Sequence, residues 1–435
     1  MGRAEVRIAT CLAGPSQLDH MVAVVKGCTM SVVARVPVGA ERLWAALLAT
    51  TLLSLPLGSV YSFSVLLRPI EQELSIRRSE LSLVFGLATV GFTVGSVWAA
   101  FLYRIASTPI LVFASAAASA GGIAIAAAAT GLVQLLLGYG IVFGTGGGVA
   151  YILLQQSVNM LVRRHRGLVN GYIVGLYPLG AMIATPSFHA CNEAFGWRTT
   201  LAGLATVLVA CGMAAALLVR LSGARLVLPA GSTSSRPTKL GATFVKLSTT
   251  FFLAASAGLM VLSQAREIVA AYGGAVALAV GATTGITAAI AMARISGGWL
   301  VDRFAVPYVA CAAHGLALCG GLLLTLYPTP VTAVLGLGMI GLGYGFVSGS
   351  TAGGIGIYWP PADYGRVAGR TYIAWCLAAV SLPVLAGYLF DMTRNYSGAM
   401  MIAVGANLAG MAMALTMPRR GWREDEKQGT ENHGR

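Results

Sequence analysis

Charged residues are scarce in this chain. They make up 10% of its 435 residues, while hydrophobic residues make up 57%. A soluble globular chain carries roughly 25% charged residues, so too little polar surface remains to cover a water-facing protein of this size. The composition excludes a soluble enzyme, a disordered chain, a collagen-like fibre and a disulfide-stapled secreted domain.

The chain also lacks the motifs of catalysis and cofactor binding. Its seven cysteines form no Cys-x-x-Cys or Cys/His cluster, so we expect neither a metal site nor a disulfide. The glycine-rich stretches 144–148 and 343–345 lack the Gly-Lys-Ser/Thr of a phosphate loop and are typical of close helix packing. We therefore expect no cofactor, no ATP hydrolysis and no enzymatic activity.

What the chain does contain is long apolar runs, each able to cross the ~30 Å hydrocarbon core as a helix. Outer-membrane strands are short and alternating, so a barrel is excluded. The first six runs cover 43–67, 79–102, 109–129, 131–154, 168–190 and 199–220. The second six cover 245–265, 272–293, 306–327, 330–357, 364–390 and 398–417. The sequence predicts an all-α polytopic membrane protein with twelve transmembrane helices in two six-helix halves.

The segments outside the apolar runs complete the predicted organisation. A tail covers 1–42, the halves cover 43–220 and 245–417, a Gly/Ser-containing linker covers 221–244, and a second tail covers 418–435. The tail 1–42 has no signal-peptide pattern, and Met30 offers an alternative start that would leave 1–29 outside the mature protein.

Basic residues gather in the tails, the linker and alternate loops, which explains the net charge of +14 without a nucleic-acid partner. This asymmetry predicts a multi-pass protein of the plasma (inner) membrane with both termini in the cytoplasm.

An internal repeat supports two related halves. Gly167-x-x-x-Gly171 begins the fifth run, and Gly365-x-x-x-Gly369 begins the eleventh. Each is followed by a proline at nearly the same distance. Small residues at this spacing let helices approach closely, and parallel repeats about an axis along the membrane normal are known among transporters.

Acidic residues are absent from the middle of every apolar run, whereas one arginine lies deep in the eighth. Arg294 precedes Asp302 by eight residues, or about 12 Å along a helix. A buried guanidinium without a carboxylate partner favours an anionic ligand, because it can hold a carboxylate in a bidentate fork. The alternative is a side chain that snorkels to the interface. His314, in the ninth run, is interpreted as a packed residue.

A possible gate follows Arg294 in the sequence. Gly298, Asp302 and Arg303 form the pattern Gly-x-x-x-Asp-Arg, which resembles a loop signature of the major facilitator superfamily, as does the six–linker–six layout. The resemblance implies that this aspartate caps or pairs with a neighbouring helix end at the cytoplasmic gate. The corresponding place in the first half holds Tyr103 before Arg104, so we expect the first-half latch to be weak or rebuilt.

Several motifs together are similar to the oxalate/formate antiporter family, a branch of that superfamily near the monocarboxylate transporters. The motifs are Gly58-Ser-Val-Tyr-Ser-Phe-Ser64, Gly148-Val-Ala-Tyr151, Arg166-Gly-Leu168, Tyr177-Pro-Leu-Gly-Ala181, Arg294 with Asp302, and Gly369-x-x-Tyr372-x-Ala-Trp375. The resemblance covers about 43–417. It implies an aromatic cage around a small carboxylate, whose charge is held by basic residues of the eighth and eleventh spans. Carried over by position, the substrate-binding residues are Arg294, Tyr61, Tyr151, Tyr177, Tyr344 and Tyr372.

Three positions depart from the family pattern. Trp375 stands where the oxalate carrier has a lysine, and Val60 replaces a glutamine of that carrier. Ile290 stands where monocarboxylate transporters often carry an aspartate. Without the lysine, we expect Trp375 to line a substrate site suited to one negative charge. Arg370 lies roughly 140° around the helix from Trp375 and does not obviously substitute. Without the aspartate, we expect weak proton coupling.

These observations predict a secondary transporter that moves a small organic anion, a monocarboxylate above others, by alternating access. Exchange or facilitated transport is expected, with the lipid bilayer and the substrate as partners and a monomeric state. Two alternatives remain open: an efflux pump for a bulkier amphipathic compound, and a non-transporting sensor on the same scaffold.

Overall fold

The computed structural model describes residues 40–103, 105–224 and 240–419, and the regular structure in these ranges is helical throughout. The prediction of an all-α protein is confirmed. Ala40 and Glu41 belong to a separate N-terminal unit, and the compact unit begins at Arg42. Most of the two predicted tails and of the linker, together with Arg104, lies outside the described residues.

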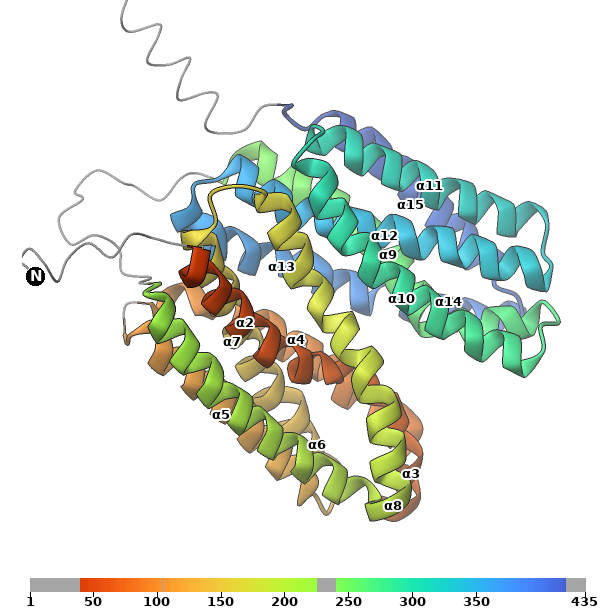
Figure 1. Ribbon diagram of the computed structural model, residues 1–435. Coiled ribbons are helices and arrows are strands. Elements are labelled where there is room, and N and C mark those ends of the chain that lie inside the picture. The colour runs from red at the N-terminus through yellow and green to blue at the C-terminus, as the bar shows by residue number, and fades with distance from the viewer. Residues whose placement is uncertain (1–39, 104, 225–239, 420–435) are drawn as a thin grey trace, which may run out of the picture. The chain divides into compact units, whose positions relative to one another are not determined.

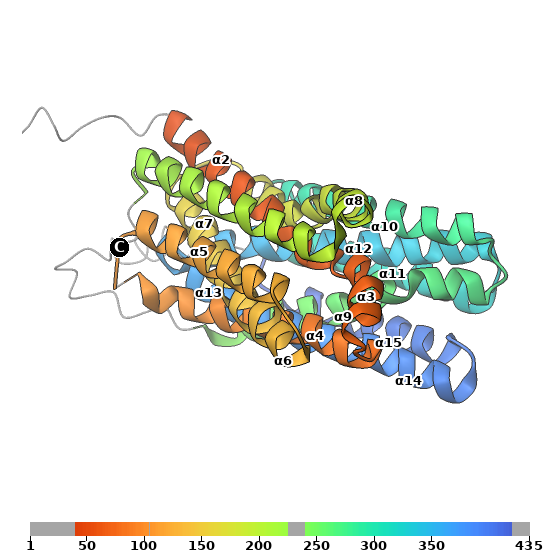
Figure 2. The same cartoon turned by 90° about the horizontal axis from the view of Figure 1, so that it is seen from below.

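The helices before the predicted linker are called here the first set, and those after it the second set. The first set contains α2 (Ala40–Leu57), η1 (Gly58–Ser62), α3 (Ser64–Leu74), α4 (Arg78–Leu102), α5 (Thr108–Ala127), α6 (Leu132–Leu135), η2 (Leu136–Phe143), α7 (Gly144–Leu161) and α8 (Arg166–Ser222). The second set contains α9 (Gly241–Ala271), α10 (Val276–Val301), α11 (Val306–Leu326), α12 (Pro330–Tyr358), η3 (Pro361–Asp363), α13 (Tyr364–Val380), α14 (Leu382–Thr393) and α15 (Ser397–Leu415). Two groups of helices, red to yellow-green and green to blue, are visible in Figure 1 and again in the view turned by 90° in Figure 2.

The twelve predicted spans all fall on helices. Eleven helical segments of the described chain are long and apolar enough to cross a membrane, and one of them, α8, contains both the fifth and the sixth predicted spans. Its 57 residues are interrupted at Gly196, where φ is 79° and ψ is 163°. This left-handed φ favours glycine, which has no Cβ to clash. The chain therefore turns back into the membrane at a single residue rather than through a longer loop.

Close backbone contact joins the two sets along α8 and α10. A Cβ added to Gly171 would lie 2.5 Å from the carbonyl oxygen of Arg294, and one on Gly298 would lie 2.7 Å from the Cα of Gly171. Any side chain at either position would push the helices apart. The glycines thus bring the backbone of α8 against the turn of α10 that carries Arg294.

Hydrogen bonds between the sets run from the middle of the bundle toward one end. That end, called here the Asp302 end, contains the connections 162–165, 302–305 and 359–363. Arg166 donates to the Gly356 carbonyl at 3.4 Å, and Gln155 donates to the Tyr364 hydroxyl at 3.1 Å. Contacts between α8 and α10, and between α4 and α13, are extensive.

At the opposite end, contacts of Glu73 stay within the first set. Its carboxylate accepts from Trp197 Nε1 at 2.6 Å and from Arg198 Nε at 2.8 Å, next to the break in α8. Arg198 also donates to the carbonyl of Ala127 at 2.9 Å. Glu73 thus ties α3 to the sharp turn in α8.

Candidate functional site

A small cavity lies between the two sets. Its volume is about 40 Å³, which is room for a few water-sized groups. The first set contributes Leu57, Val60, Tyr61, Phe85, Ala88, Thr89, Phe92, Phe143, Gly144, Gly147, Tyr151, Val174 and Tyr177. The second contributes Phe251, Arg294, Tyr344, Ser348, Tyr372 and Trp375.

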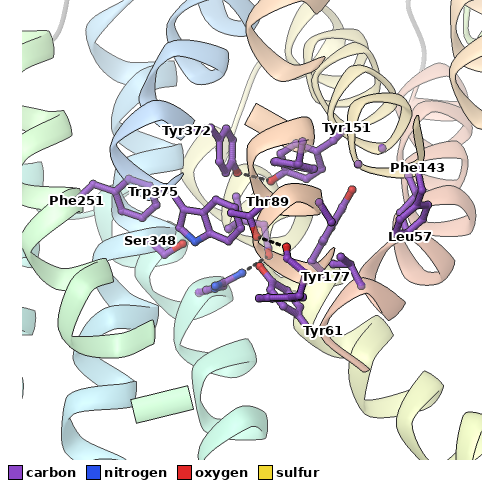
Figure 3. Close-up of a pocket in the computed structure, with 18 of the residues that line it drawn as sticks. Leu57, Tyr61, Thr89, Phe143, Tyr151, Tyr177, Phe251, Ser348, Tyr372 and Trp375 are labelled. Atoms are coloured by element: carbon purple, nitrogen blue, oxygen red, sulfur yellow. Dashed lines mark hydrogen bonds between the residues drawn. The ribbon is translucent and has the colours of Figure 1, made fainter. Parts of the chain in front are cut away.

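All seven predicted substrate-binding residues line this one cavity. Figure 3 shows Tyr61, Tyr151, Tyr177, Tyr372 and Trp375 directed toward the common space. They come from η1, α7, α8 and α13, so residues up to 314 positions apart in the sequence meet here. Their role in binding remains a prediction.

Arg294 enters the cavity from α10 and is 4% exposed. Its Nη1 donates to the Val174 carbonyl of α8 at 3.1 Å, and its Nη2 donates to the Tyr344 hydroxyl of α12 at 2.9 Å. The buried Nε has no hydrogen-bond partner within the described part of the chain. The guanidinium therefore does not snorkel to the interface, and it retains a donor for a ligand.

The Tyr344 hydroxyl oxygen receives two hydrogen bonds. Arg294 is one donor, and the indole Nε1 of Trp375 is the other, at 3.1 Å. Because arginine and the indole nitrogen can only donate, the oxygen acts as acceptor in both bonds. The Tyr344 hydroxyl proton thus remains able to donate to a ligand.

One further hydroxyl of the cavity has the same polarity, and another lacks a partner within the described segments. Tyr372 donates to the Tyr151 hydroxyl oxygen at 2.8 Å, which leaves the Tyr151 proton free for another acceptor. The buried Tyr177 hydroxyl has no partner among the residues that the structure describes. Arg294 Nε and the hydroxyl protons of Tyr344 and Tyr151 thus remain available to a ligand that accepts hydrogen bonds.

Phe92, on α4, lies at the centre of the aromatic side chains and was not predicted. Its ring centroid is 5.6 Å from that of Tyr151, 5.7 Å from Tyr177, 5.4 Å from Tyr372 and 6.0 Å from Trp375. The contact with Tyr151 is tilted and the other three are edge-on, and such contacts favour a fixed mutual orientation of the rings. No sequence signal distinguishes Phe92 from the apolar residues of the same span that face lipid.

The lining contains one guanidinium and no carboxylate. Rings exclude water on several sides, so electrostatic attraction within the cavity is stronger than in bulk solvent. Arg370 and His314 are not among the lining residues. Nδ1 of His314 lies 2.9 Å from Oδ1 of Asn407, between α11 and α15, in agreement with its interpretation as a packed residue.

Two of the three predicted gating residues lie in the contact between the sets. The Asp302 carboxylate accepts from the backbone amides of Gly167 at 2.7 Å and Leu168 at 2.8 Å, and a carboxylate at a helix N-terminus is stabilised by the helix dipole. Gly298 packs against the same turn of α8. The Arg303 guanidinium instead lies over the ring of Trp299, in the last turn of α10, with its central carbon 3.9 Å from the ring centroid.

Comparisons with known proteins agree with this architecture. Residues 47–383 match the model of the Major Facilitator Superfamily. The chain is 26% identical over 139 residues to the uncharacterized MFS-type transporter YhjX of Escherichia coli (strain K12), a match that spans 32% of this chain and 35% of that protein. It is 25% identical over 314 residues to monocarboxylate transporter 13 of Bos taurus, covering 68% and 70% of the two chains.

Solved transporter structures share the fold. The MFS transporter FucP in the outward conformation superposes with a TM-score of 0.68 at 16% identity, over 86% of this chain and 98% of that chain. The proton:xylose symporter XylE gives 0.66 at 14% identity, over 87% and 96%. Together with the match over residues 47–383, these findings show that the chain belongs to the Major Facilitator Superfamily.

Proposed function

We propose that this protein carries a small monocarboxylate across the plasma membrane by alternating access. The observation that carries the proposal is the buried Arg294, whose Nε lacks a partner among the described residues in a cavity lined by hydroxyl donors. A carboxylate is an acceptor-only group, and a guanidinium matches it geometrically. The monocarboxylate transporters among the relatives support this substrate class.

Cavity size and charge narrow the choice of ligand. Space for a few water-sized groups suits an acid of formate, lactate or pyruvate size better than a bulky amphipathic compound. One guanidinium balances one carboxylate, and a second carboxylate would lose its water without gaining a partner. The proposed order of preference is therefore monoanions before dianions such as oxalate.

The two ends of the bundle supply the alternating access. With the Asp302 end taken as cytoplasmic, its inter-set bonds close the cavity toward the cytoplasm, and the substrate enters from the opposite end. Arg294 is hydrogen-bonded to Tyr344 of α12 in its own set and to the Val174 carbonyl of α8 in the other set. A carboxylate that binds to Arg294 therefore acts on a contact between the two sets. The sets then rock, the Asp302-end bonds break, and the acid leaves. Exchange or facilitated transport follows, because the cavity offers no carboxylate to carry a proton.

A competition assay tests this function. The purified protein is reconstituted in vesicles, and uptake of radiolabelled formate, lactate and pyruvate is measured with and without the same acid inside. We expect saturable uptake of at least one acid, stimulated by internal acid and weakly inhibited by oxalate and by neutral sugars. Sugar uptake, or export of an amphipathic dye without carboxylate uptake, would contradict the proposal.

A further inference from the structure

The contact between α8 and α10 is repeated on the other side of the bundle between α13 and α4. In the first contact, Gly171 approaches the Arg294 carbonyl oxygen. In the second, Gly369 lies against the carbonyl of Ser96, and Gly365 lies beside the Tyr103 hydroxyl. The repeat therefore places Tyr103 where Asp302 stands in the other contact.

Tyr103 does not perform the task that Asp302 performs. Asp302 caps α8 by accepting from two backbone amides. The buried Tyr103 hydroxyl, in contrast, has no hydrogen-bond partner in the described ranges. If nothing replaced the missing carboxylate, the first turn of α13 would present a buried amide without an acceptor, at a cost in free energy.

Gln156 of α7 supplies the missing acceptor. Its Oε1 accepts from the backbone amide of Gly365 at 2.5 Å. Its Nε2 donates to the carbonyl of Pro361 at 2.8 Å and, more weakly, to that of Ala362 at 3.5 Å. The side-chain amide of Gln156 thus pairs with one backbone N–H and two backbone carbonyls at the start of α13 and in the connection before it. The Gln156 residue is 2% exposed.

We propose that Gln156 is the rebuilt first-half latch of this transporter, a gating residue that replaces the absent carboxylate at Tyr103. The inference rests on the proposed function, because it assumes that the Asp302 end opens during transport. The two latches differ in chemistry: Asp302 is charged and holds α8, whereas Gln156 is neutral and holds α13.

The position of Gln156 connects the latch to the cavity. Its bonds join α7 of the first set to the first turn of α13, and they must break when the sets separate at this end. The same helix α13 carries Tyr372 and Trp375, which line the cavity. Release of Gln156 therefore frees the helix that forms one wall of the substrate site.

Hydrogen–deuterium exchange of the purified protein in lipid nanodiscs, without substrate, tests this proposal. We expect Gln156→Ala to speed exchange roughly fivefold, the effect of losing one ordinary hydrogen bond, in peptides covering 361–368 and also in peptides covering 167–171. The matched control is Ser157→Ala. The Ser157 hydroxyl donates to the Leu153 carbonyl within the same helix, so its removal breaks no contact between the sets. Faster exchange confined to 361–368 would indicate a local helix cap and overturn the gating role, as would equal effects of both variants.

A second variant tests the equivalence of the two contacts. Adding Tyr103→Asp to Gln156→Ala returns a carboxylate to the position that Asp302 holds in the other half. We expect protection of 361–368 and 167–171 to recover to within about twofold of the parent protein. Exchange as fast as in Gln156→Ala alone would overturn the proposed replacement of Tyr103 by Gln156. The exchange experiment contains no substrate, so its result does not depend on which compound is transported. A failed carboxylate uptake assay would therefore not overturn the role of Gln156, and unchanged exchange would not overturn carboxylate transport.

Discussion

Trp375 donates its indole N–H to the Tyr344 hydroxyl at 3.1 Å, and the same oxygen accepts from Arg294. The bond connects α13 with α12 and, through the shared oxygen, with the guanidinium on α10. With its oxygen occupied twice, Tyr344 can offer a ligand only its proton. Trp375 therefore adds no charge to the cavity, but it orients a donor beside Arg294.

Arg294→Ala should abolish uptake of the preferred monocarboxylate while the protein still folds into the membrane. Removal of one partner of a buried charge pair costs about 3 kcal/mol, roughly a hundredfold in affinity. Arg294→Lys should fail as well, because an ammonium lacks the planar fork. Uptake into vesicles and size-exclusion profiles measure the two effects. Arg266→Ala, at an exposed position of α9, serves as the control, and undiminished uptake by Arg294→Ala would remove this residue from the site.

Trp375→Lys should shift the preference toward dianions. The added ammonium would face the same cavity as Arg294 and could balance a second carboxylate, whose unpaired burial otherwise costs several kcal/mol. The ratio of the oxalate inhibition constant to the formate inhibition constant should fall at least tenfold, because a smaller constant means tighter binding. Trp375→Phe removes the indole donor without adding charge and should not lower that ratio. Equal transport of oxalate and formate by the unmodified protein would show that another base reaches the cavity.

Transport should depend only weakly on an imposed proton gradient. The cavity lining contains no carboxylate, and His314 lies outside it with its Nδ1 beside Asn407. A pH-sensitive dye inside the vesicles, read during substrate uptake, measures proton movement. One proton entering with each substrate molecule would contradict this expectation and direct attention to His314 or to Glu267.

Glu73→Gln should lower the thermal stability slightly at neutral pH and less in acid. Hydrogen bonds from Arg198, and then from Trp197, lower the pKa of the Glu73 carboxyl below its ordinary value of 4.5. Such a group stabilises the fold above its unfolded pKa, and the contribution is lost as pH falls through the lowered folded pKa. The difference in Tm between the two proteins should therefore shrink below pH 4.5. A difference that grows in acid would contradict the assignment.

Sequence-based prediction identified the helical membrane fold because the length of an apolar run depends only on local composition. It missed the continuity of α8, since 191–198 looks like a loop, whereas a single left-handed glycine at Gly196 completes the turn. It found the deep arginine because a charge is conspicuous among apolar residues. Phe92 is not conspicuous in that way. Gln156 escaped notice because its partner Gly365 lies 209 residues away in the sequence.

The aromatic enclosure of the cavity sets a condition on ions that enter it. The cavity has space for only a few water-sized groups. A carboxylate bound there, as we propose, would therefore have to exchange its hydration shell for tyrosine hydroxyls and one guanidinium. Every acid small enough to enter would meet the same hydrogen-bond donors in the cavity. The free-energy cost of removing water from the carboxylate, in contrast, differs from acid to acid. Discrimination between similar acids should therefore follow how weakly each ion holds its water, in the manner of a Hofmeister series, more than how many contacts its tail makes.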